Sequence, residues 1–144
     1  MPAATHTVTV DRPVEQVFAF FTDHGNDPQW RPLVKQIDPV GGPAAVGSVI
    51  HQVVKGPAGR GIPSDIEVTA YDPSEHYAFK VVKGPVRPVG EFRFVPEGNG
   101  TRVSLSLHAE LSGVKKVLLS RPVQHSMDGE VSALDRAKDL LERA

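Results

Sequence analysis

The chain has 144 residues, with 16 basic and 17 acidic side chains, a formal net charge of −1 and no cysteine. This length fits one domain, residues 1–144, which is long enough to bury its own core. The near-neutral charge argues against nucleic acid as a partner, and the lack of cysteine excludes disulfides, thiolate metal sites and a cysteine nucleophile.

The first residues, MPAATHTVTVDRP, carry no basic start followed by an apolar run, so they do not resemble a secretory signal. No segment approaches the roughly 18 to 20 apolar residues that a membrane span requires. We therefore expect a cytoplasmic protein without a membrane span. The histidines show neither HxH nor HExxH spacing, so we expect no zinc site and no other cofactor.

Residues 5–11, THTVTVD, alternate in the manner of a strand and include β-branched side chains. A helix follows, because Pro13 suits a first helical turn and Glu15 complements the helix dipole there. It should end near Asp23, where DHGNDP consists of turn-forming residues. One apolar stripe recurs at helical spacing and is formed by Val14, Val17, Phe18 and Phe21.

From about residue 33 the pattern changes to short segments bounded by Gly, Pro, Asp or Asn, which predict further strands. The last of them is the clearest, because apolar and polar residues alternate from Val103 to Leu111. EGNG, residues 97–100, predicts a tight hairpin turn before it. Strands in series with short turns indicate an antiparallel meander. The predicted strands are residues 33–40, 47–55, 64–72, 76–84, 90–97 and 100–112.

The chain ends in a helical stretch, roughly residues 114–143, whose main part Pro122 should start or kink. This order of elements predicts an α+β fold, in which a strongly curved antiparallel sheet of about seven strands wraps around the long C-terminal helix. The apolar residues that share one sector of this helix are Val123, Met127, Val131, Leu134 and Leu141.

A curved sheet around a single helix leaves a space wherever the inward residues are small or flexible. Met127 and Gly129 on the helix and Ala109 on the last strand meet that condition. Because a deep apolar cavity with few polar groups is the usual form of a small-molecule site, we expect a small hydrophobic molecule as the partner. The sequence leaves the oligomeric state open.

Two stretches of the sequence resemble a known family. The opening VTVDRPVEQVFAFFTD with PQW after it, and the PEGNGTRVSL hairpin followed by LSG and AKDLLE, are similar to the START-related helix-grip superfamily (SRPBCC), in its polyketide cyclase/dehydrase-like branch. The resemblance covers almost the whole chain. It implies a helix-grip fold with two short helices between the first two strands, and a cavity for a hydrophobic ligand. Some members cyclise or dehydrate polyketides, but the resemblance supplies no catalytic motif.

Trp30, the only tryptophan of the chain, comes directly after the polar turn. It either anchors the fold without touching a ligand or forms a stacking wall of the pocket. Core packing and pocket lining are equal alternatives for the strand phenylalanines. The further candidates for ligand binding are Phe79, Phe92, Phe94, Val123 and Met127.

Two residues are candidates for proton transfer. Glu130 projects onto the apolar sector of the terminal helix, where it lies at the rim, pairs with an arginine, or faces the cavity as a general acid or base. His51 lies in SVIHQVV, whose two faces are both apolar, so it is a satisfied structural histidine, a solvent-facing side chain, or an inward proton-transfer group.

Two function classes follow from these features. The first is a carrier or binding domain for a polycyclic, acyl-chain or polyketide-like molecule. The second is a polyketide cyclase or dehydratase that works without metal or cofactor, with Glu130 or His51 moving protons. A module that binds a protein partner is a further alternative. A ligand that purifies with the protein would distinguish small-molecule binding from that last role.

Overall fold

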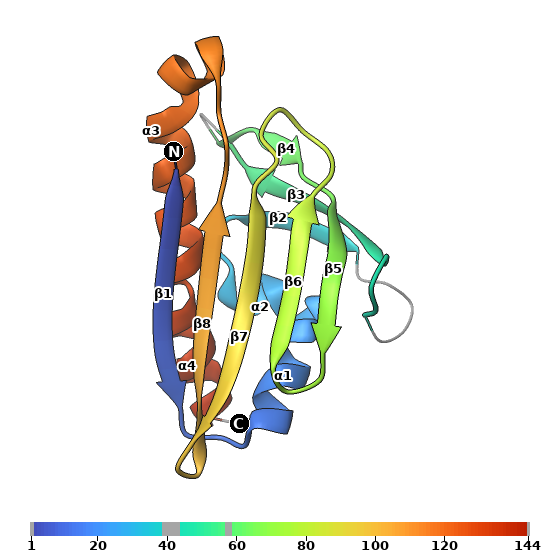
Figure 1. Ribbon diagram of the computed structural model, residues 1–144, viewed down its shortest axis with the longest axis vertical. Helices are drawn as coiled ribbons and strands as arrows, with labels where there is room; N and C mark the ends of the chain where they lie inside the picture. The colour runs from blue at the N-terminus through green and yellow to red at the C-terminus, as the bar shows by residue number, and fades with distance from the viewer. Residues whose placement is uncertain (1, 39–43, 57–58, 144) are drawn as a thin grey trace.

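The computed structural model describes residues 2–38, 44–56 and 59–143. Its elements confirm the expected order of strand, short helices, strands and C-terminal helices (Figure 1). In chain order they are β1 (Ala3–Val10), α1 (Val14–Thr22), the short 3-10 helix η1 (His24–Asn26), α2 (Asp27–Trp30), β2 (Val34–Asp38), β3 (Val49–Lys55), β4 (Gly61–Pro63), β5 (Ile66–Asp72), β6 (His76–Val81), β7 (Val89–Glu97), β8 (Gly100–His108), α3 (Gly113–Ser132) and α4 (Leu134–Arg143).

Seven strands form an antiparallel sheet in the order β1-β8-β7-β6-β5-β3-β2, and β4 pairs with β3 beside this path. The strands from β5 to β8 follow one another as a meander, as the sequence predicts. β1 and β2 are consecutive in the chain but lie at opposite edges of the sheet, so α1, η1 and α2 form the crossover between them. β2 and β3 run obliquely across the direction of the other strands, which curls the sheet (Figure 1).

The helices lie on one side of this sheet. α3 and α4 run alongside β1 and β8, while α1 and α2 lie toward the other strands (Figure 1). None of the helices in the described parts of the chain combines the length and the apolar character that crossing a bilayer demands.

The start of α1 forms as its sequence dictates. Pro13 is the residue before the first helical turn, with an extended backbone, and Glu15 supplies the negative charge of that turn. Val17, Phe18 and Phe21 are buried, which confirms the apolar stripe. This stripe attaches α1 to the sheet and sets the position at which the chain enters η1 and α2.

The C-terminal helical stretch is continuous through Pro122 and breaks instead at Ala133. The amide of Ala133 is shared between the carbonyls of Gly129 and Glu130, a three-centre arrangement that is common at helix ends. The sector named from the sequence is confirmed: Val123 is half-buried, and Met127, Val131, Leu134 and Leu141 are buried.

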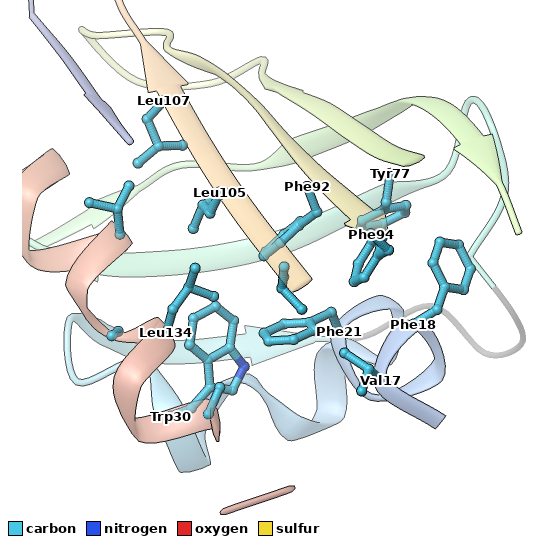
Figure 2. Close-up of a cluster of buried hydrophobic side chains, with 14 of the residues drawn as sticks. Val17, Phe18, Phe21, Trp30, Tyr77, Phe92, Phe94, Leu105, Leu107 and Leu134 are labelled. Atoms are coloured by element: carbon cyan, nitrogen blue, oxygen red, sulfur yellow. The ribbon is translucent and has the colours of Figure 1, made fainter. Parts of the chain in front are cut away.

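Aromatic side chains fill the core between α1 and the sheet. Figure 2 shows Phe21 among Trp30, Phe92 and Phe94, with Phe18 beyond it toward Tyr77. The ring centroids of Phe21 and Phe92 are 5.1 Å apart, and those of Phe18 and Phe94 are also 5.1 Å apart. This packing fills the space under α1 and leaves the region between the sheet and α3 open.

Candidate functional site: a cavity between sheet and helix

A cavity of about 1200 Å³ lies between the curled sheet and α3. The sheet contributes Ile66, Phe79, Phe92 and Leu105 to its walls, and α3 contributes Val123 and Met127. The walls are mostly apolar, so the cavity suits a hydrophobic molecule better than water.

A glycine in the sheet makes room for one of these walls. Gly90 of β7 lies opposite Phe79 of β6 in the strand register. A Cβ at position 90 would come within 2.5 Å of Cζ of Phe79 and 2.7 Å of Cδ2 of Leu107. Gly90 therefore provides space for both of these cavity-lining side chains.

Trp30 packs as an anchor of the fold and also lies in the wall of the cavity. It is buried, and its ring lies 5.2 Å from that of Phe21 in an edge-to-face contact, so it anchors α2 to α1. The same side chain also lines the cavity. Its position is compatible with ligand contact, and that contact itself stays a prediction.

Four other candidates also line the cavity, namely Phe79, Phe92, Val123 and Met127. Phe94 is different, because it is not among the described cavity-lining residues. It lies farther along β7, where its ring packs 5.1 Å from Phe18 and 6.1 Å from Phe21. The expectation that Phe94 lines the pocket is wrong, because α1 covers this part of the sheet.

A buried polar chain begins at His24 and Asp27, which both line the cavity. Nδ1 of His24 lies 2.9 Å from Oδ2 of Asp27, and Nε2 of His24 lies 2.7 Å from the hydroxyl of Tyr77. With a neutral ring protonated on Nδ1, His24 donates to Asp27 and accepts from Tyr77, which satisfies both ring nitrogens. Helix η1, helix α2 and strand β6 are thereby joined inside the core.

Arg31, directly after α2, continues this chain into the cavity. Its Nη1 donates to Oδ2 of Asp27 at 2.8 Å and to Oε1 of Gln52 at 3.1 Å. Its Nε donates to Oε2 of Glu130 at 2.9 Å. Only 10 % of the Arg31 side chain is exposed, and all four residues line the cavity. They form a polar cluster in an otherwise apolar site.

The electrostatics of this chain have clear physical causes. Burial would lower the pKa of the Arg31 guanidinium, but attraction by Glu130 and Asp27, with their hydrogen bonds, raises that pKa overall, so Arg31 stays charged. Burial raises the pKa of the Tyr77 hydroxyl, with Asp27 and Tyr71 adding to the effect. Tyr77 therefore remains a neutral hydrogen-bond donor over the physiological range.

The two proton-transfer candidates occupy different places. Glu130 lines the cavity with its side chain 17 % exposed, and it pairs with Arg31. His51 points away from the cavity, with 68 % of its side chain exposed and its Nδ1 2.7 Å from Oδ2 of Asp65. The inward alternative for His51 is wrong, because its neighbours Ile50 and Gln52 are the buried residues of β3.

Sequence reasoning missed His24, Asp27, Arg31 and Gln52. The first two belong to DHGNDP, whose turn-forming residues also carry the buried hydrogen bonds. Asp27 and Arg31 stand four residues apart, the spacing of a helical ion pair, and this signal was present in the sequence. Gln52 gave no such signal. Across the described ranges, no three His, Asp or Glu side chains are grouped so that they could hold a metal ion.

Comparison with known proteins identifies a family. Residues 1–141 match the family described as polyketide cyclase / dehydrase and lipid transport. This match confirms the resemblance to the helix-grip superfamily that the sequence carries. Among curated proteins, none matches the sequence significantly.

Several solved structures share the fold. The protein TTHA0849 from Thermus thermophilus is 24 % identical, with a TM-score of 0.79 and 97 % coverage of both chains. A START superfamily protein from Mycobacterium smegmatis is 17 % identical, with a TM-score of 0.77, covering 98 % of this chain and 97 % of that one. The Zhui aromatase/cyclase from Streptomyces sp. R1128 is 18 % identical, with a TM-score of 0.71, covering 95 % of this chain and 93 % of that one. At such identities the likeness concerns the fold alone.

Proposed function

This chain belongs to the polyketide cyclase/dehydrase and lipid transport family, and from that premise we propose that it binds a small hydrophobic molecule in the cavity between the sheet and α3. Polyketide-like, polycyclic and acyl-chain molecules are the ligand classes that match its walls. Trp30, Phe79, Phe92, Val123 and Met127 would surround the apolar body of the ligand.

The cavity is the observation that carries this proposal. Its volume of about 1200 Å³ exceeds the roughly 300 to 1,000 Å³ of ordinary small-molecule pockets. Because the walls carry Phe, Leu, Ile and Val side chains, replacing water in a space of this size with an apolar molecule lowers the free energy. The buried cluster around Arg31 adds a small number of oriented polar groups, which is the usual basis of ligand orientation.

Native mass spectrometry of the freshly purified protein tests this function. We expect a second population whose mass exceeds that of the chain by one small molecule, and we expect organic extraction to release that molecule. Gentle spectra that contain the bare chain alone, together with no saturable uptake of the apolar dye Nile red, would contradict the proposal.

Glu130 favours a catalytic form of the same function. Its carboxylate lies in the cavity, where it would remove a proton from a carbon beside a ligand carbonyl and return it to a departing hydroxyl group. The C–H and C–O bonds would break, a C=C bond would form, and water would leave. This is the dehydration expected for a polyketide-like substrate, whereas a carrier would bind the same molecule unchanged.

A single substitution separates carrier from enzyme. Glu130→Gln retains the size of the side chain and an acceptor oxygen for Arg31 but removes the proton-transfer group. If the protein dehydrates a β-hydroxy ketone, turnover should fall by about 100-fold or more in this variant while ligand binding persists. Equal turnover in both proteins would remove Glu130 from the chemistry.

A further inference from the structure

We infer that Arg31, Gln52 and Glu130 form a subsite for a neutral oxygen-bearing group of the ligand, a ketone or a hydroxyl, and that the subsite discriminates against a carboxylate. This inference rests on the proposed function, because it specifies which end of a hydrophobic ligand lies against this part of the cavity. The three side chains come from the α2–β2 connection, β3 and α3, so they converge from different elements.

The cluster leaves polar atoms available to a ligand. Nε and Nη1 of Arg31 are occupied by Glu130, Asp27 and Gln52. Nη2 of Arg31 has no hydrogen-bond partner among the described residues, although the side chain is nine-tenths buried and lines the cavity. An oxygen acceptor on the ligand would satisfy this donor, which otherwise lies in a largely apolar site.

Gln52 offers the ligand a second hydrogen-bond donor, and Glu130 offers it an acceptor. Gln52 uses its carbonyl oxygen to accept from Arg31, which leaves its amide nitrogen as a second donor for the ligand. Glu130 accepts from Arg31 with Oε2, and its other carboxylate oxygen makes no hydrogen bond within the described part of the chain. A carbonyl would accept from Arg31 and Gln52, and a hydroxyl would in addition donate to Glu130.

The geometry of the cluster is fixed before a ligand arrives. Three acceptors from separate elements hold the Arg31 guanidinium at 2.8 to 3.1 Å, so it has little freedom to turn toward a new partner. Preorganised donors lose less entropy on binding and therefore orient a ligand more strongly.

The charge of the cluster decides between a neutral and an anionic oxygen group. The Arg31 guanidinium pairs with the two carboxylates of Asp27 and Glu130. When His24 is neutral, the cluster therefore carries one excess negative charge. A ligand carboxylate would add a further negative charge beside them in a poorly solvated site, where like charges repel strongly. A ketone or alcohol brings the oxygen without this penalty.

Displacement of Nile red by four matched molecules tests the inference. Methyl octyl ketone, decanol, decanoate and decane have the same number of carbon atoms and differ in the oxygen group. At mildly alkaline pH we expect the ketone and the alcohol to displace the dye at concentrations at least about tenfold lower than decane or decanoate. Saturable dye binding with equal displacement by all four would overturn the subsite and leave the proposed function intact.

Two variants test the roles of charge and donor. Glu130→Gln removes the excess negative charge, so decanoate should bind about tenfold better than it does to the unaltered protein. Gln52→Met removes the amide donor, together with one acceptor of Arg31, at similar size, and it should lower the affinity for the ketone severalfold while the affinity for decane is unchanged. His51→Gln, outside the cavity, is the matched control and should change none of these affinities.

The remaining outcomes are also decisive. If decanoate binds the unaltered protein more tightly than the other three molecules do, the inference is overturned, because the subsite would then accept an anion. The absence of any saturable Nile red binding would overturn the proposed function itself.

Discussion

Tyr77 is the residue on which the buried chain ends. With His24 protonated on Nδ1, the Tyr77 hydroxyl donates to Nε2 of His24 at 2.7 Å, and the Tyr77 side chain is completely buried. Tyr77→Phe leaves that ring nitrogen without its donor, so the free energy of unfolding should fall by about 1 to 3 kcal/mol. Urea unfolding at neutral pH measures the change.

Tyr71 supplies the matched control for this experiment. It is half-buried, and its hydroxyl makes no hydrogen bond among the described residues. Tyr71→Phe should therefore change stability much less than Tyr77→Phe. Equal effects of the two substitutions would contradict a special role for the bond to His24.

The raised pKa of Tyr77 predicts how stability changes in alkali. Below pH 10, the ordinary pKa of tyrosine, the hydroxyl is protonated in both the folded and the unfolded chain. Above it the unfolded chain ionises while burial keeps folded Tyr77 neutral, so stability falls as the pH rises. Urea unfolding between neutral and strongly alkaline pH should show that the free energy of unfolding falls less in Tyr77→Phe than in the unaltered protein. An identical dependence of that free energy on pH in the two proteins would contradict this linkage.

Trp30 reports on the cavity without any substitution. It is the only tryptophan, it is buried, and it lines the cavity beside Phe21. A bound aromatic ligand should therefore quench or shift its emission. Unchanged emission when the cavity is saturated would remove Trp30 from the binding surface and leave it as an anchor of α2.

Single residues also show where the sequence was informative. Helical periodicity correctly put Glu130 on the apolar face of the terminal helix but left the rim, an arginine pair and the cavity open; in the structure Glu130 both pairs with Arg31 and lines the cavity. His51 could not be assigned, because both faces of its strand were apolar and only the fold shows that Ile50 and Gln52 are on the buried face. The contacts of Arg31 with Gln52 and Glu130 could not be derived either, since these two partners come from segments far apart in the sequence.

The C-terminal helices carry both side chains that pack in the core and side chains that line the cavity. Leu134 is fully buried in the core, whereas Met127 is buried but lines the cavity. A truncation in a packed core costs about 2 to 5 kcal/mol, and a side chain with open space on one side loses fewer contacts. Met127→Ala should therefore destabilise the protein clearly less than Leu134→Ala in urea unfolding.

An equal and large decrease in the free energy of unfolding for Met127→Ala and Leu134→Ala would mean that the space beside Met127 is filled. The comparison is internal to one helical stretch, because α3 and α4 are separated only by the break at Ala133. Binding of Nile red adds a second readout, since Met127→Ala should alter it and Leu134→Ala should not.

Elements were predictable where local patterns were strong. The β8 strand alternates over its whole length, and the α1 stripe recurs at helical spacing, so both are confirmed. β4 was missed because it has only three residues and is held by pairing with β3. The break at Ala133 was missed because neither glycine nor proline marks it; beyond the break, α4 packs against β1 and α2.

At the scale of the whole molecule, the curl of the sheet produces the binding space. The phenylalanines of α1 pack against one part of the concave side (Figure 2), and the cavity occupies the part that faces α3. The order of elements predicted this arrangement, because a single terminal helix covers only part of a curved sheet. The identity of the ligand depends on side chains rather than on the fold.

Filling the cavity from α3 tests the central claim that this space is the binding site. Ser126 and Gly129 both line the cavity, and a Cβ at position 129 makes ordinary contact with Leu33 at 3.4 Å. The double variant Ser126→Phe/Gly129→Phe would place two rings there. The control Val114→Phe/Val117→Phe has the same spacing on the same helix at exposed positions.

Nile red titration of these two variants is the most direct measurement. With both proteins folded by circular dichroism, we expect the filled variant to lose at least about tenfold in dye affinity and the exposed control to match the unaltered protein. Unchanged dye affinity in the filled variant would contradict the claim that the cavity between the sheet and α3 holds the ligand.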